Sequence, residues 1–294
     1  MYGPTQSVIE VVAVLRRHVP DDTYRFPPAS DFTGRNVYRS TLLRLENLER
    51  VHSDALRAGH LDATIHFAKA RSLERLRSYD LAAEHYRVAA ERSQTLRNEA
   101  LRSAHTCEEL HAATEVGIDL ANPLAAQGSS PPFSTDDQQV LANLDERMAR
   151  LSSLATDHKE THYRFVIREE AERADVIRAR YFVTMRHALP DGSLRAVSEL
   201  QRVVTRHGPS KNRLRHMLDL ADFYAALAED YAKANPPESL RFDPVVFQEL
   251  ADGASQIYQS VASEDGTPEK LEAARHFEAF LAFTLQVDRD RFTR

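Results

Sequence analysis

Two short helical patterns meet between Leu61 and Arg97, and this stretch constrains the fold more than any other part of the chain. In each half, apolar residues three and four positions apart form one stripe on a helix. The first stripe consists of Ala63, Phe67, Ala70, Leu73 and Leu76, and the second of Ala82, Tyr86 and Ala89. Ser78 lies in the break and is expected to cap the second helix. Because one helix pair cannot bury its own apolar face, the sequence predicts that further helices stack on it.

This helix, turn and helix over residues 61–94 resembles a tetratricopeptide (TPR) repeat. Degenerate copies of the second stripe recur further along the chain, at Ala196, Leu200 and Val203 and at Ala254, Tyr258 and Val261. The resemblance implies a curved solenoid whose concave face binds a peptide or partner protein. The groove-facing positions that it implies are Thr64, Phe67, Arg71, Glu74 and Arg75. The alternative is that Arg71, Glu74 and Arg75 form a solvated face with ordinary ion pairs.

The rest of the chain is also typical of helices. Glycine is scarce, at 9 of 294 residues, and alternating strand patterns are nearly absent. We therefore expect an all-α fold, with antiparallel helical hairpins stacked as a TPR-like α-solenoid of about 10–11 helices. The helical pattern from residue 135 to 188 is too long for one helix of ordinary length, so we expect a break near Ser152 to Asp157.

One low-complexity segment suggests how the chain is divided. Residues 124–133 include the run Ala-Ala-Gln-Gly-Ser-Ser-Pro-Pro, a composition typical of flexible links. The sequence thus predicts an N-terminal helical lobe at residues 1–122, a linker at 123–134 and a C-terminal helical lobe at 135–294.

Charge and cysteine content narrow the class of protein. A net charge of -6 is typical of an ordinary soluble surface and disfavours nucleic acid as a partner. Cys107 is the single cysteine, so no internal disulfide can form. The apolar run at residues 8–15 is too short to span a membrane, and its arginines follow it, whereas a signal peptide has them first. We expect a cytoplasmic protein, with a periplasmic or surface-attached mature form, its signal removed, as the alternative.

Histidines and glutamates raise the question of a metal site. Glu49 and His52, like Glu108 and His111, have the spacing of ligands in di-iron helical bundles, but chance alone predicts such pairs. His158 and His162 could share a helix face, and no third ligand is evident. Phosphate loops, nucleophile elbows and dinucleotide fingerprints are absent. The sequence favours a non-catalytic scaffold or adaptor without a cofactor, and a metal-binding helical-bundle enzyme is the alternative.

A basic cluster offers a second kind of site. Between positions 202 and 216 no acidic residue interrupts five cations, which are Arg202, Arg206, Lys211, Arg213 and Arg215. Part of the cluster falls in the first turns of a helix expected to start near Ser210, where cations are unfavourable. One interpretation is an anion site or a basic helix-turn-helix patch for nucleic acid. The other is that the side chains are solvated or pair with acids such as Glu169, Glu170 or Glu172.

The last predicted helix is apolar over more than one face. Its apolar residues are Leu271, Ala274, Phe277, Phe280, Leu281, Phe283 and Leu285. A surface helix needs a narrower stripe to contact one core. Either residues 240–247 cover the extra face, or the chain forms a homo-oligomer through this helix.

Overall fold

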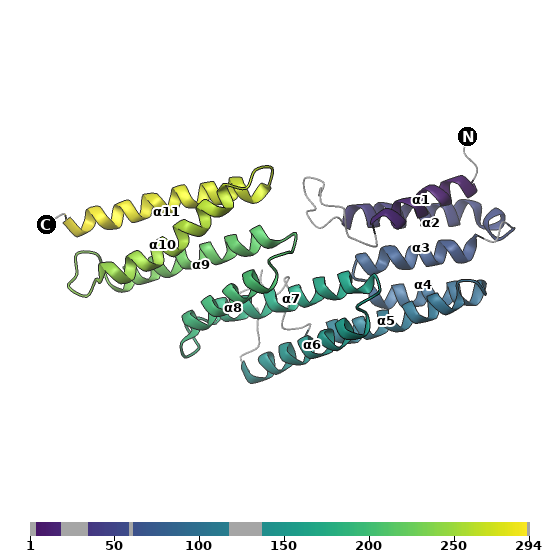
Figure 1. Ribbon diagram of the computed structural model, residues 1–294, viewed down its shortest axis with the longest axis horizontal. Coiled ribbons are helices and arrows are strands. Elements are labelled where there is room, and N and C mark those ends of the chain that lie inside the picture. The colour runs from purple at the N-terminus through teal and green to yellow at the C-terminus, as the bar shows by residue number, and fades with distance from the viewer. Residues whose placement is uncertain (1–3, 19–34, 59–60, 118–136, 293–294) are drawn as a thin grey trace. The chain divides into compact units, whose positions relative to one another are not determined.

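The computed structural model describes residues 4–18, 35–58, 61–117 and 137–292, which form eleven helices and no strand (Figure 1). The predicted all-α class is confirmed. Contacts divide the chain into two compact units, Met1–Ala174 and Asp175–Arg294. The division falls inside a helix, whereas the linker predicted at 123–134 lies outside the described residues, as do the proline-rich residues 19–34. Each unit is treated separately below.

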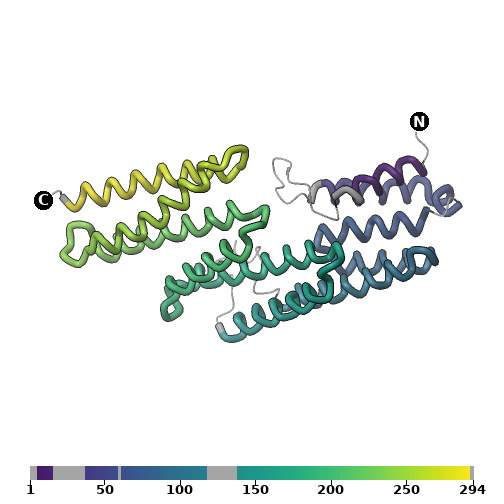
Figure 2. Tube along the Cα trace, viewed as in Figure 1, coloured from purple at the N-terminus to yellow at the C-terminus, as the bar shows by residue number. Residues whose placement is uncertain are grey.

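The first unit contains a run of helices, from α1 to α6, in which each helix packs against the next in sequence. Its helices are α1 (Pro4–His18), α2 (Arg35–Ala58), α3 (Asp62–Arg75), α4 (Tyr79–Arg92), α5 (Arg97–Glu115), α6 (Asp137–Asp157) and the first part of α7 (Tyr163–Thr184). Figure 2 follows this order from purple α1 to blue α5. The predicted division into two helices is confirmed, but the break lies at residues 158–162, just after the expected Ser152 to Asp157, which form the end of α6.

A three-residue turn joins α3 to α4. The amide of Ser78 donates to the carbonyl of Leu73, at 3.0 Å, and the amide of Arg77 donates to that of Glu74, at 3.1 Å. These two bonds close α3 as a Schellman motif, with Arg77 in the left-handed region at φ 65°. The expected cap is wrong, since the Ser78 side chain makes no capping hydrogen bond to α4. Its backbone amide ends the preceding helix instead.

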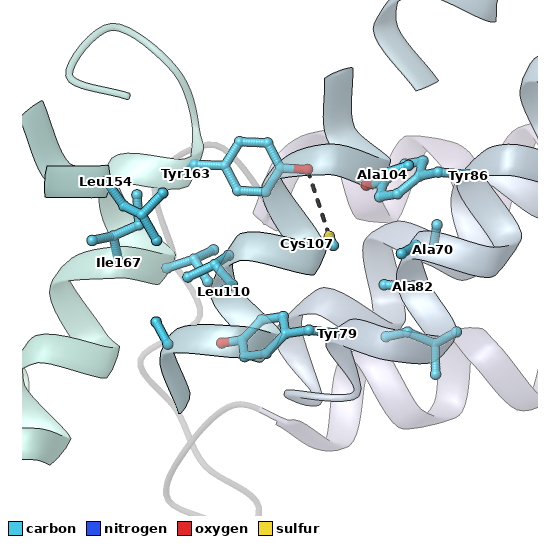
Figure 3. Packing of buried hydrophobic residues seen from close by; sticks show 14 of the residues in the cluster. Ala70, Tyr79, Ala82, Tyr86, Ala104, Cys107, Leu110, Leu154, Tyr163 and Ile167 are labelled. Atoms are coloured by element: carbon cyan, nitrogen blue, oxygen red, sulfur yellow. Dashed lines mark hydrogen bonds between the residues drawn. The ribbon is translucent and has the colours of Figure 1, made fainter. Parts of the chain in front are cut away.

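Alanines let α3 and α4 pack closely, as the sequence predicted. Ala70, Ala82 and Ala89 are fully buried, and the tyrosine between the last two, Tyr86, is buried with them. Figure 3 shows this core, where Cys107 and Leu110 of α5 join the α3–α4 pair. A separate apolar cluster forms where α1 and α2 meet α3.

The second unit holds the rest of α7 followed by α8 (Gly192–Arg206), α9 (Arg213–Ala234), α10 (Pro244–Ala262) and α11 (Pro268–Phe292). Helices α9, α10 and α11 pack pairwise around an apolar core that contains Ala254, Tyr258 and Phe280. At the start of α8, a Cβ on Gly192 would lie 2.3 Å from the carbonyl oxygen of Arg186, so only glycine fits there.

Within the described ranges, no helix is both long and apolar enough to cross a membrane.

Candidate functional site

A buried carboxylate organises the centre of the first unit. Glu74 of α3 accepts a 2.7 Å hydrogen bond from the hydroxyl of Tyr86 and a second from that of Tyr163, while His162 lies 3.3 Å away. Burial would raise the pKa of this carboxyl, but the charge of Arg71 and the bonds from His162 and Tyr163 outweigh burial and lower the pKa to about 2. Glu74 is therefore a buried anion at neutral pH, and α3, α4 and α7 are tied together through it.

Arg71 links this carboxylate to the surface. One of its terminal nitrogens, Nη1, lies 3.4 Å from Glu74, and the other, Nη2, donates to Glu99 of α5 at 3.1 Å. The guanidinium also lies over the rings of Phe67, at 5.1 Å, and Tyr86, at 5.6 Å, from their centroids. Arg71 is only 13% exposed, whereas Glu99 is 55% exposed. The cation is thus fixed in place by its surroundings, and its outer partner is free to move in solvent.

A recess of about 440 Å³ opens beside Arg71. Its walls come from α3, α5 and the turn between α6 and α7. The lining side chains are almost all polar: Arg71, Glu99, Arg102, Ser103, Thr106, His158, Thr161, His162 and Tyr163. Volumes of this size are typical of sites for small ligands or single side chains. Cationic and hydrogen-bonding groups thus converge on this recess.

The five groove positions implied by the TPR resemblance have different surroundings. Thr64 and Phe67 are partly buried, and the Phe67 ring meets that of Tyr86 edge to face at 5.1 Å. Glu74 is fully buried and Arg75 nearly so, with Arg75 donating to Glu169 at 3.0 Å. Only Arg71 lines the recess.

Sequence reasoning assigned no binding role to Arg102. His158 and His162 were considered as a metal pair on one helix face, and the structure places both in the turn between α6 and α7, at the edge of the recess. Arg102 precedes these histidines by about sixty positions in the sequence, and Arg71 by about ninety. No local pattern predicts contacts between residues so far apart in the chain.

A second buried carboxylate anchors the α3–α4 turn. Glu170 of α7 is fully buried and accepts bonds from Arg77 Nε at 2.7 Å, Arg77 Nη2 at 2.9 Å and the hydroxyl of Tyr79 at 2.8 Å. Burial raises the pKa of the Glu170 carboxyl. The charge of Arg173 and the hydrogen bonds from Arg77 have a larger and opposite effect, so the pKa lies below its ordinary value. The left-handed conformation of Arg77 is thereby held by the two bonds of its own side chain.

The basic cluster of the second unit is mostly paired with acids. Asp175 of α7 is buried and lies 3.0 Å from both Arg202 and Arg206 and 2.8 Å from His207. Arg213 pairs with Glu264 at 2.7 Å. Arg215 pairs with Asp219 at 3.0 Å and Glu272 at 2.7 Å. Two of the acids suggested from the sequence, Glu169 and Glu170, instead bind arginines of the first unit.

The candidate metal ligands do not converge. Glu49 is an acceptor for Lys69 and lies 3.1 Å from His66, and Glu108 is an acceptor for Arg87. Among the residues that the structure describes, no three His, Cys, Asp or Glu side chains are grouped in a way that could hold a metal ion. Burial raises the pKa of the Cys107 thiol, so Cys107 is a poor nucleophile.

No family model, curated protein or solved structure matches this chain.

Proposed function

We propose that this chain is a non-catalytic adaptor that binds a protein or peptide partner through its first unit. The observation that carries the proposal is the recess of about 440 Å³ beside Arg71, in a unit built from consecutively packed helices. Such stacks present a surface to a partner rather than enclosing a reaction, and here that surface contains a cavity sized for a side chain.

We further propose that the unit is a TPR-like helical repeat. Support comes from the α3–α4 hairpin, in which the small residues Ala70, Ala82 and Ala89 are fully buried and Tyr86 fills the space beside them. The next helix, α5, packs on α4 as a neighbouring repeat helix would. Arg71 is the TPR groove position that also lines the recess, so it connects the two proposals.

The proposal is tested by selecting peptides from a random display library on the purified full-length chain. We expect enriched sequences that bind with micromolar Kd, a range set by interfaces of modest area. The control is a variant of the same chain with the recess filled, Ser103→Phe, checked by circular dichroism for an intact fold. Enrichment of the same peptides by the filled variant, or no enrichment by the wild type, would contradict the proposal.

We also propose that α11 provides a surface for self-association. Leu271 and Leu285 are 65% and 68% exposed, although Phe280 of the same helix is buried. The segment expected to cover them does so only in part, because Phe242 and Phe247 are buried while Leu240 remains exposed. Light scattering at high micromolar concentration should show a dimer that Leu271→Ser with Leu285→Ser converts to a monomer. A monomeric wild type would exclude this interface.

The proposed location is the cytoplasm, supported by a single cysteine that is buried and unable to form an internal disulfide. Fractionation of cells that express the chain with its natural flanking sequence tests the proposal. Recovery in the periplasmic or surface fraction would contradict it.

A further inference from the structure

Three features of the recess bear on what it binds. The first is its charge. Arg71 and Arg102 both line it, and Glu99 is the only acidic residue among the lining side chains. Arg102 is exposed and makes no ion pair with any residue that the structure describes. An arginine that faces a cavity without a carboxylate partner has its donors available for a ligand.

The second feature is the nature of the other polar groups. The hydroxyls of Thr106 and Thr161 each donate to a backbone carbonyl at 3.1 Å, so they present oxygen lone pairs rather than hydrogens to the recess. The imidazole of His158 lies 3.5 Å from the Thr106 hydroxyl, and its ring centroid lies 5.5 Å from that of Tyr163. Strong donors are therefore confined to the two guanidinium groups, with the imidazoles beside them.

The third feature is the position of Glu99. Its carboxylate accepts a hydrogen bond from Arg71 Nη2 at 3.1 Å, although the Glu99 side chain is more than half exposed. The Glu99 end of this pair is open to solvent, so another oxyanion can reach Arg71 and replace Glu99 there. The inner partner of Arg71, Glu74, is fully buried and cannot move out in the same way.

We infer that the recess binds an oxyanion, a carboxylate or phosphoryl group, which displaces Glu99 from Arg71 and is held from the other side by Arg102. The inference rests on the proposed function in one respect, since it takes the oxyanion to be a side chain of the bound peptide. Arg71 is the preorganised donor, because its rotamer is fixed by the buried Glu74 and by Phe67 and Tyr86. Glu99 acts as an internal competitor that lowers the affinity of Arg71 for any added anion.

The test uses inorganic phosphate and succinate as probes, titrated into the full-length chain while amide chemical shifts are followed. We expect saturable shifts confined to residues 99–106 and 158–163. Arg102→Gln should raise the Kd for the probe about tenfold, because one charge-assisted contact is lost. Glu99→Gln should lower the Kd about threefold, because the carboxylate that competes for Arg71 is removed.

Arg57→Gln is the matched control, since Arg57 is an exposed arginine of α2, which does not line the recess, and its loss changes the net charge equally. Its Kd should equal that of the wild type. Equal effects of Arg102→Gln and Arg57→Gln, or a Glu99→Gln variant that binds more weakly, would overturn the inference. Preference for phosphate or for succinate tells which oxyanion the recess takes.

The two proposals fail separately. If display selects peptides whose affinity Arg102→Gln leaves unchanged, the adaptor function stands and the oxyanion site is wrong. If phosphate or succinate binds at the recess and no peptide is selected, the oxyanion site stands and the peptide partner is wrong. Selected peptides rich in glutamate or carrying phosphoserine, each compared with its glutamine or serine counterpart, support both.

Discussion

The α3–α5 core of the first unit and the α9–α11 core of the second use charge differently. In the first, Glu74 is 0% exposed and its partner Arg71 is 13% exposed, so the ion pair is part of the core. In the second, the α9–α11 core is made of alanines and aromatic rings, and the ion pair between Arg213 and Glu264 is 42% and 46% exposed. Charged side chains thus take part in the packing of the first core and lie at the surface of the second. The buried carboxylate of the second unit, Asp175, belongs to α7 and lies outside the α9–α11 core.

This difference has a physical consequence for stability. A buried carboxylate is tolerated only when hydrogen bonds and a cation replace its lost water, as Tyr86, Tyr163 and Arg71 do for Glu74. Removal of one partner leaves the others buried and unpaired. When an exposed ion pair is broken, water replaces the lost contacts, so the free energy of unfolding changes little. The following predictions test the contrast, beginning with the largest effect.

Glu74→Ala should destabilise the first unit by about 3–5 kcal/mol, because it leaves Arg71 and two tyrosine hydroxyls buried without their common acceptor. Urea unfolding measures the loss, and hydrogen exchange over residues 62–115 assigns it to this unit. A loss below about 1 kcal/mol would mean that the Glu74 network is not structural.

Acid should weaken the first unit through the same carboxyl. The folded-state pKa of Glu74, about 2, lies below its ordinary value of 4.5, so the stabilisation is complete above pH 4.5 and is lost as the pH falls toward 2. The loss is roughly 3 kcal/mol over that interval, from about 1.4 kcal/mol per pKa unit. Urea midpoints across this pH range measure it. Glu74→Gln should flatten the profile, and an unchanged slope in that variant would contradict the assignment.

Tyrosine hydroxyls provide a matched pair across the two units. Tyr86 and Tyr258 each donate to a carboxylate at 2.7 Å, but Glu74 is buried whereas Asp222 is 35% exposed. Tyr86→Phe should cost about 1.5–3 kcal/mol, and Tyr258→Phe about 1 kcal/mol, because water can reach Asp222. Equal losses in urea unfolding would show that the burial of the acceptor is irrelevant.

Glu264→Gln should have the smallest effect, about 0–1 kcal/mol, because both members of its pair are exposed. The small loss should also shrink further in salt, which screens exposed charges. A loss of unfolding free energy as large as that of Glu74→Ala would contradict the contrast drawn between the α3–α5 core and the α9–α11 core.

Helix positions could be predicted from the sequence, because each helix carries a local apolar period. The pattern from residue 135 to 188 indicated two helices, as the structure has them, although the break falls a few residues after the expected Ser152 to Asp157. Local chemistry was less reliable, since Ser78 occupies a capping position without capping. The backbone amide of Ser78 was already engaged by the end of α3.

The candidate site could not be predicted from the sequence, because its residues come from separate helices. Glu74 carries a charge, which favours the surface in any pattern-based prediction, and only the tyrosines and the arginine around it make its burial possible. Arg102 and His162 have no local signal that links them. Arg71 and Glu74 were selected, and only because they occupy groove positions of the TPR resemblance.

Hydrogen exchange of the full-length chain, with and without a saturating display-selected peptide, tests the central claim most directly. The claim is that the partner binds at the recess formed by α3, α5 and the α6–α7 turn. We predict slower exchange over residues 99–106 and 158–163, with α9–α11 unchanged. Protection restricted to residues 271–285, or absent from 99–106 and 158–163, would contradict the account.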